Sequence, residues 1–177
     1  MRYAQIRELD ISNGEGVGVA LFVQGCRFAC KNCFNPDTWD FNGGKEWTQD
    51  TEDKLIELAS RPYIKRLSIL GGEPLADENL DGVLHLVNRF RLLFPNKSIW
   101  LYSGYTWSEI FNDGVYLTRD CAGWKRREIV KKCEVLVDGR YIDSQRNVQA
   151  KWRGSDNQRV INIQGSLKQG KVVLHCD

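Results

Sequence analysis

The sequence predicts an α/β protein whose parallel sheet closes only part of a barrel, in a single domain spanning residues 1–177. A strand–helix pattern recurs three times after residue 33, and each strand ends in a small or polar turn. Repeated units of this kind imply a parallel sheet with right-handed crossovers. A complete eight-unit barrel takes about 250 residues. The shorter length of 177 residues therefore predicts an open, partial barrel.

The first elements are two strands joined by a glycine-rich turn. Residues 3–9 alternate weakly and read as the first strand, and residues 17–23 form an apolar second strand. The turn at residues 13–18 has the Gly-x-Gly-x-Gly spacing, but it leads into a strand rather than a helix. That context is wrong for a dinucleotide-binding motif, so we expect a flexible, hairpin-like turn.

The later elements follow from apolar periodicity and from glycine and proline stops. A helix capped by Thr48 or Asp50 has an acidic first turn and ends before Pro62. The elements expected after it are a strand at 64–70, a helix at 77–94, a strand at 98–102, a short helix at 107–111, a helical segment at 128–132 and a strand at 134–137. Residues 158–163 and 171–175 are expected to pair as an edge ribbon across a glycine-bearing turn.

Three thiols lie close together at Cys26, Cys30 and Cys33, a Cys-x3-Cys-x2-Cys spacing with no obvious fourth partner. A structural zinc site and a ferredoxin-type cluster each take four protein ligands. The spacing therefore suggests a cubane iron–sulfur cluster with one iron open to a non-protein ligand. The alternatives are unconnected buried thiols, or a zinc site completed from elsewhere in the chain. The residues that would complete such a zinc site are His85, Cys121, Cys133, His175 and Cys176.

A second motif, Gly71-Gly72-Glu73-Pro74, directly follows the apolar strand at 64–70. Paired glycines let a backbone approach a ligand closely, and the Glu73 carboxylate can accept a hydrogen bond from an ammonium group. The end of a parallel strand is also where α/β enzymes place their chemistry.

Together the two motifs resemble the radical S-adenosylmethionine enzymes. Other segments narrow the resemblance to the small activating enzymes of anaerobic ribonucleotide reductase. These segments are Asn13–Gly16, Phe22–Cys26, Cys33–Pro36, Leu101–Tyr105, Val135–Tyr141 and Arg153–Arg159. The residue before the last cysteine is usually aromatic in the wider superfamily, but here it is Asn32. The reductase-activating subgroup tolerates a small residue there, so this departure favours the narrower assignment.

The resemblance implies an enzyme that generates a glycyl radical on anaerobic ribonucleotide reductase. It implies that Cys26, Cys30 and Cys33 hold a [4Fe-4S] cluster whose open iron binds S-adenosylmethionine, which is cleaved reductively to methionine and a 5′-deoxyadenosyl radical. The predicted cofactor-binding residues are Asn32, Gly71, Gly72, Glu73, Ser103 and Asp138, with Arg153 and Asn157 as further candidates. The implied protein partners are the reductase and an electron donor such as flavodoxin or ferredoxin.

Two other functions remain open at this point. One is another small radical enzyme, of the pyruvate formate-lyase activase or tRNA-guanine-modifying type, and the other is a zinc-binding interaction module. The net charge of +2 argues neither for nor against nucleic acid, and we expect no nucleic-acid partner. Residues 140–171 carry seven Lys or Arg against two Asp, as a solvated surface or an acidic partner's docking site would. No apolar run approaches the roughly 20 residues of a membrane span, so we expect a cytoplasmic protein.

Overall fold

A single open sheet organises the molecule in this computed structural model, which describes residues 1–111 and 121–176. The strands lie in the order β3-β1-β2-β4-β5-β6-β7. Their bounds are β1 (Arg2–Asp10), β2 (Gly18–Val23), β3 (Lys45–Glu46), β4 (Arg66–Gly71), β5 (Ser98–Ser103), β6 (Val135–Asp138) and β7 (Arg159–Asn162). Strands β2, β4, β5 and β6 are parallel, and β1 and β7 flank them in antiparallel pairing. The expected mixed α/β architecture with a central parallel sheet is confirmed.

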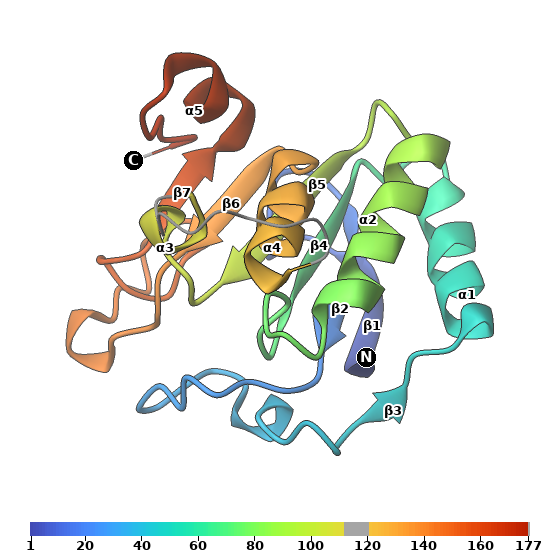
Figure 1. The fold of residues 1–177 in the computed structure, drawn as a ribbon, viewed down its shortest axis with the longest axis horizontal. Helices are drawn as coiled ribbons and strands as arrows, with labels where there is room; N and C mark the ends of the chain where they lie inside the picture. The colour runs from blue at the N-terminus through green and yellow to red at the C-terminus, as the bar shows by residue number, and fades with distance from the viewer. Residues whose placement is uncertain (112–120, 177) are drawn as a thin grey trace.

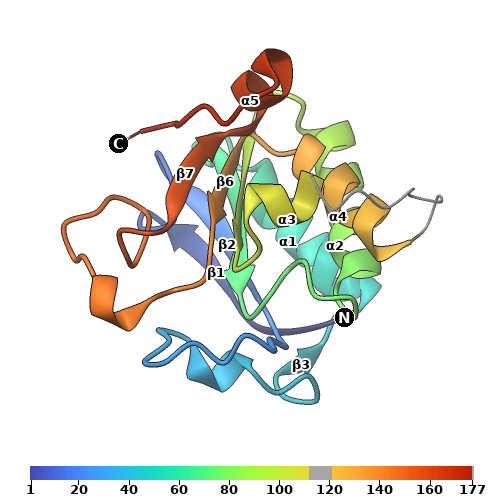
Figure 2. The same ribbon diagram turned by 60° about the vertical axis from the view of Figure 1, so that its left-hand side comes forward.

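The helices gather on one face of this sheet. They are α1 (Gln49–Ser60), α2 (Leu80–Leu93), α3 (Trp107–Phe111), α4 (Ala122–Lys131) and α5 (Ile163–Gln169), with short 3-10 turns η1 (Pro36–Thr38) and η2 (Asp143–Gln145). Figure 1 shows α2 and α4 in front of the strands, with α1 beside α2 at the right. Figure 2 shows α1–α4 on one side of the strands, the loop after β6 on the other side, and the loop after β2 below them. No helix in the described ranges is long and apolar enough to cross a membrane.

Strand alternation divides the side chains between the two faces of the sheet. On β4, Leu67 and Ile69 join the main core beneath the helices, whereas Leu70 joins a smaller cluster with Ala20 and Phe22. Helix α1 begins as expected, because the Thr48 side chain accepts a hydrogen bond from the Thr51 N–H at 3.3 Å. The helix face is therefore filled by packing, and the opposite face keeps room for a site.

The C-terminal tail departs from the prediction. Residues 158–163 were expected to pair with residues 171–175, but β7 pairs with β6 and α5 occupies the supposed turn. The Asn162 side chain caps α5 by accepting from the Gly165 N–H at 2.8 Å, and Gly170 ends it with a φ of 66°. One antiparallel bridge between Ile161 and Leu174 joins the two segments, through hydrogen bonds from Asn162 N–H to the Val173 carbonyl at 2.9 Å and from His175 N–H to the Val160 carbonyl at 2.7 Å. The expected pairing is therefore confirmed at this bridge, whereas the expected turn is a helix and the ribbon extends no further.

A buried ion pair fastens the glycine-rich turn to the face opposite the helices. Arg66 Nη2 lies 2.7 Å from Asp10 Oδ2, and both residues are buried. The same guanidinium donates to Ser68 Oγ at 2.5 Å and to the Glu15 carbonyl at 3.1 Å. A Cβ atom on Gly18 would lie 2.5 Å from Arg66 Cγ, so that position requires glycine.

Removing one partner of this pair should destabilise the fold strongly. Arg66→Met leaves the Asp10 carboxylate buried without its cation, which typically costs about 3–5 kcal/mol. The free energy of unfolding, measured in urea on the metal-free protein, should fall by that amount. The matched control is Arg61→Met, because Arg61 and Glu8 form an exposed pair at 3.8 Å. The free energy of unfolding of this variant should fall by less than about 1 kcal/mol. Equal losses in the two variants would contradict this account.

Candidate functional site

A pocket of about 470 Å³ opens on the face opposite the helices, a size within the usual range for small-ligand sites. Its floor takes one side chain from each parallel strand: Phe22, Leu70, Tyr102 and Val137. One wall is the segment that follows β2, which Figure 2 shows below the strands, at their carboxyl ends. This is the edge of a parallel sheet at which ligands bind in open α/β proteins.

The three cysteines predicted to bind metal all line this pocket. Their loop folds back on itself because Ala29 and Asn32 adopt left-handed backbone angles, with φ of 47° and 55°. Cys33 N–H donates to the Cys30 carbonyl at 3.1 Å, which closes the second half of the loop.

Arginine–aromatic stacking holds the cysteine loop against the segment after β6. The Arg140 guanidinium lies 4.4 Å from the ring centroid of Phe28, and that of Arg146 lies 5.6 Å from the ring of Phe34. Phe34 also meets Tyr141, with ring centroids 5.0 Å apart. Part of the basic segment at 140–171 therefore serves to pack the loop in place.

The thiols lie in surroundings that disfavour an uncompensated negative charge. Burial raises the pKa of Cys26 to about 11. Burial also raises the pKa of Cys30, and the neighbouring Cys33 adds to that shift. A bound metal reverses this balance, because its charge stabilises the coordinating thiolate.

Backbone donors toward the sulfurs also suit a cluster. Asn35 N–H donates to Cys33 Sγ at 3.4 Å, and the backbone N–H groups of Phe28 and Tyr141 lower the pKa values of Cys26 and Cys30 against the effect of burial. Hydrogen bonds to the sulfurs are one of the means by which proteins tune iron–sulfur clusters. No three His, Cys, Asp or Glu side chains in the described parts of the chain converge as ligands of one metal ion. A cubane binds each thiolate through a different iron, so the donor set fits a cluster.

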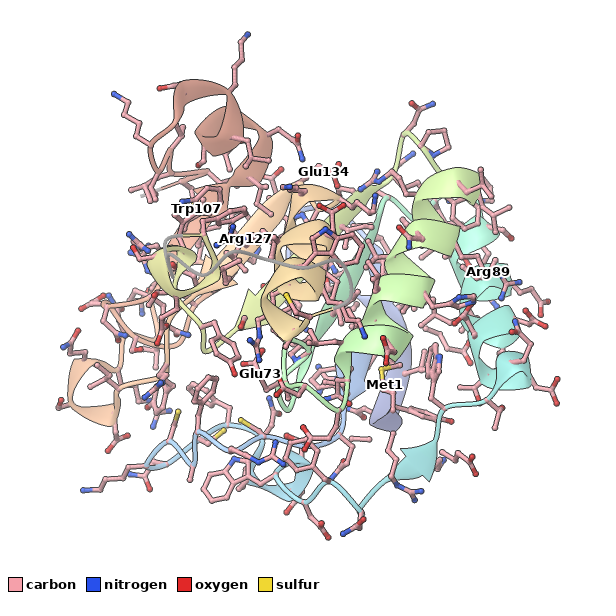
Figure 3. All side chains as sticks on the ribbon, in the orientation of Figure 1. Met1, Glu73, Arg89, Trp107, Arg127 and Glu134 are labelled. Carbon is pink, nitrogen blue, oxygen red and sulfur yellow. The ribbon has the colours of Figure 1, made fainter. Side chains whose placement is uncertain are left out.

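Glu73 joins the ends of two strands at the pocket wall. Its buried carboxylate accepts hydrogen bonds from Leu75 N–H, Ser103 Oγ and Gly104 N–H, each at 2.8 Å. Burial raises the pKa of Glu73 to about 7 in spite of these donors. Figure 3 shows Glu73 beside the loop that carries the yellow sulfur atoms.

The Gly71-Gly72 pair connects this strand end to the cysteine loop. Gly72 N–H donates to the Val23 carbonyl at 2.9 Å, and Glu73 N–H donates to the Gly25 carbonyl at 2.8 Å. A Cβ atom on Gly72 would lie 2.6 Å from the Gly25 carbonyl oxygen. Because Gly72 has no side chain, the backbone just before Cys26 can lie against it. This packing is a second reason for glycine at this position, besides the close approach of a ligand.

The remaining predicted cofactor residues fall into two groups. Gly71, Gly72, Glu73, Ser103 and Arg153 line the pocket with the cysteines. The others are outside its lining. Asp138 is buried and accepts from Trp107 N–H at 2.7 Å and from Arg159 Nε at 3.0 Å. Exposed Asn32 donates to Asp143 at 2.8 Å, and Asn157 donates to the Arg140 carbonyl at 2.8 Å.

The residues considered for a zinc site lie apart from the three cysteines. Cys121 caps α4, Cys133 donates to the Ile129 carbonyl at 3.2 Å, and His85 lies 3.3 Å from Glu52. His175 lies 3.2 Å from Glu15 and packs on Trp100. None of these, nor Cys176, is among the described residues that line the pocket.

Comparison with known proteins agrees with these motifs. Residues 12–161 match the family model described as a 4Fe-4S single cluster domain. A Vibrio cholerae protein named anaerobic ribonucleoside-triphosphate reductase-activating protein is 39% identical over 160 residues, which cover 89% of this chain and 96% of the relative. Proteins of the same name from Enterobacteria phage T4 and Escherichia coli K12 are 36% and 35% identical, covering 90% and 92% of this chain and 93% and 99% of theirs.

The raised pKa of Glu73 predicts that the stability of the metal-free protein falls as the pH rises. Its pKa moves from 4.5 to about 7 on folding, so the folded state binds more protons between these values. The contribution is complete below about pH 4.5 and is lost above about pH 7, with a total of roughly 3 kcal/mol.

Urea unfolding of wild type and Glu73→Gln from pH 4 to 8 measures this contribution. The stability of wild type relative to Glu73→Gln should decline through that window. Glu57→Gln, on the exposed side of α1, is the matched control and should parallel wild type. Parallel curves for wild type and Glu73→Gln would show that the carboxyl is not perturbed.

Proposed function

The chain belongs to the family of anaerobic ribonucleoside-triphosphate reductase-activating proteins, and we propose that it activates an anaerobic ribonucleotide reductase by generating a glycyl radical on it. The observation that carries the proposal is the meeting of Cys26, Cys30 and Cys33 with Gly72 and Glu73 in one pocket. In this proposal the open sheet is a partial barrel of the radical S-adenosylmethionine type, and residues 1–177 form one such domain.

Two cofactors would supply the electron transfer and the radical formation. A [4Fe-4S] cluster held by Cys26, Cys30 and Cys33 would pass one electron to S-adenosylmethionine, and the break of a carbon–sulfur bond to give methionine and a 5′-deoxyadenosyl radical would provide the species that takes a hydrogen atom from a glycine of the reductase. The protein contributes binding, orientation and exclusion of water. An external one-electron donor such as flavodoxin or ferredoxin is required.

The chain's own residues suit these tasks. Cys26, Cys30 and Cys33 would hold the cluster. Glu73 would accept a hydrogen bond from the ammonium group of the cofactor, since Oε2 accepts one bond in the structure, from Gly104 N–H, and a carboxylate oxygen has room for another. Ser103 fixes this carboxylate from the next strand.

The other predicted residues would support the site in different ways. Gly71 and Gly72 bring the end of β4 against the cysteine loop. Asn32 would steady that loop through Asp143, and Asp138 would steady the segment after β5 through Trp107. The apolar floor beneath them keeps water from the reacting groups.

Single cysteine variants test the cluster. Wild type reconstituted without oxygen should contain about four irons and four sulfides per chain, and Cys26→Ala, Cys30→Ala and Cys33→Ala should each abolish cleavage of S-adenosylmethionine. Cys121→Ala, Cys133→Ala and Cys176→Ala are the matched controls, because these thiols lie outside the pocket lining, and they should retain the iron. Stoichiometric zinc with no iron after reconstitution would exclude the cluster.

Electron paramagnetic resonance tests the activation itself. Reduced protein with S-adenosylmethionine should cleave the cofactor slowly when alone, and adding the reductase should produce a glycyl-radical signal. Replacing the target glycine of the reductase by alanine should abolish that signal. Stoichiometric turnover of a small molecule without a protein partner would instead identify an ordinary radical enzyme.

A further inference from the structure

Two polar atoms in the pocket region are buried without a hydrogen-bond partner. They are the hydroxyl oxygen of Tyr102 and Nε of Arg153, the side-chain atoms of this kind in the described residues. Both residues line the pocket. A buried polar group without a partner costs about 1–3 kcal/mol, and native structures contain few of them. Two such atoms in residues that line one pocket are hydrogen-bonding groups that a ligand in that pocket can use.

The surroundings of the Tyr102 side chain differ from those of the cysteine loop. The Tyr102 ring packs between the cluster around Phe22 and Leu70 and the cluster around Trp100. Burial raises the pKa of Tyr102, and Arg66 and Asp10 act on it electrostatically. Asp10 and Arg66 lie at the amino ends of the parallel strands, whereas the cysteines follow their carboxyl ends. Ser12 and Asn13, which follow Asp10 in the chain, line the pocket, so the pocket has a second polar end besides that of the cysteines.

The segment at residues 146–155 covers this second end. A bridge between Arg146 and Ser155 closes its base, and Trp152 packs on Trp100 with ring centroids 4.9 Å apart. Trp152 has a φ of 59°, a strained angle for a bulky side chain. A segment held under strain over an unpaired hydroxyl can shift when a ligand offers that hydroxyl a bond.

Building on the activation proposed above, we propose that Tyr102 and Arg153 form a subsite for main-chain carbonyl groups of the reductase segment that carries the target glycine. A glycine has no side chain, so the enzyme must recognise the peptide backbone around it. Arg153 Nε–H can only donate and the Tyr102 hydroxyl can donate, so both match carbonyl oxygens. The cofactor, held at the cysteine and Glu73 end, leaves this end of the pocket to the substrate.

Tyr102→Phe removes only the hydroxyl and tests the subsite. The dissociation constant of the reductase from the reconstituted protein, measured without oxygen, should rise roughly 2- to 12-fold, as expected for one neutral hydrogen bond. The melting temperature of the free variant should be unchanged or higher, because no hydrogen bond is lost in the free protein. Arg153→Lys keeps the charge, removes Nε–H and should weaken reductase binding as well.

Tyr63→Phe is the matched control, since Tyr63 is 49% exposed and lies outside the pocket lining; it should bind like wild type. Reductase binding at the wild-type level in both Tyr102→Phe and Arg153→Lys would overturn the subsite. A lower melting temperature for Tyr102→Phe would reveal a structural partner and overturn it too. Weaker S-adenosylmethionine binding with unchanged reductase binding would assign the groups to the cofactor instead. Failure of the proposed function is distinct, because wild type itself would then neither bind nor activate the reductase.

Discussion

The site depends on the joint between the end of β4 and the cysteine loop, by which we mean the backbone hydrogen bonds of Gly72 and Glu73 with Val23 and Gly25. Gly72 and Glu73 donate through their backbone N–H groups to the carbonyls of Val23 and Gly25, the residues that lead into Cys26. Two further bonds, from Gly25 N–H to the Thr38 carbonyl and from Cys26 N–H to the Trp39 carbonyl, hold the other side of the same segment. The position of the first thiol is therefore set by the sheet. The Glu73 carboxylate extends the joint to Ser103 and Gly104 on the next strand.

This joint places the Glu73 carboxylate near the thiols of the cysteine loop, so that groups which become negative on ionisation lie close together in partly buried surroundings. Burial is the main cause of the raised pKa of Cys26, and the Glu73 carboxylate and the Cys30 and Cys33 thiols add to it. Such an arrangement is unfavourable in the metal-free protein and becomes favourable when a cationic partner is present. The arginines around the loop do not neutralise it fully, because their guanidinium groups stack on Phe28 and Phe34 and remain near solvent. The site is thus prepared for a positively charged occupant.

Most of the fold could be predicted from the sequence because its signals are local. Apolar periodicity located α1 and α2, and the parallel strands ended at the expected small or polar turns. The tail could not be predicted in the same way: the cap at Asn162 and the stop at Gly170 outweigh the strand-like composition of residues 171–175. Within the site, the cysteine spacing and the Gly-Gly-Glu motif could be recognised in the sequence. Tyr102 could not be recognised as a site residue, because in the sequence it is one aromatic residue of an apolar strand. Only the structure shows its hydroxyl buried without a partner.

The open sheet supports the proposal that the substrate at this pocket is a protein and not a small molecule. Strands β3 and β7 lie at opposite edges and do not pair, so the strands do not close around the pocket. The turn at 13–18 is fastened by Arg66, and the segment at 146–155 packs on Trp100, so both flanks already have partners within the chain. The contact between Glu15 and His175, at 3.2 Å, joins the turn to the C-terminal tail. A reactive radical must be shielded from water. In the proposed activation, a partner that brings its own backbone into the remaining opening would provide that shield and the hydrogen atom together.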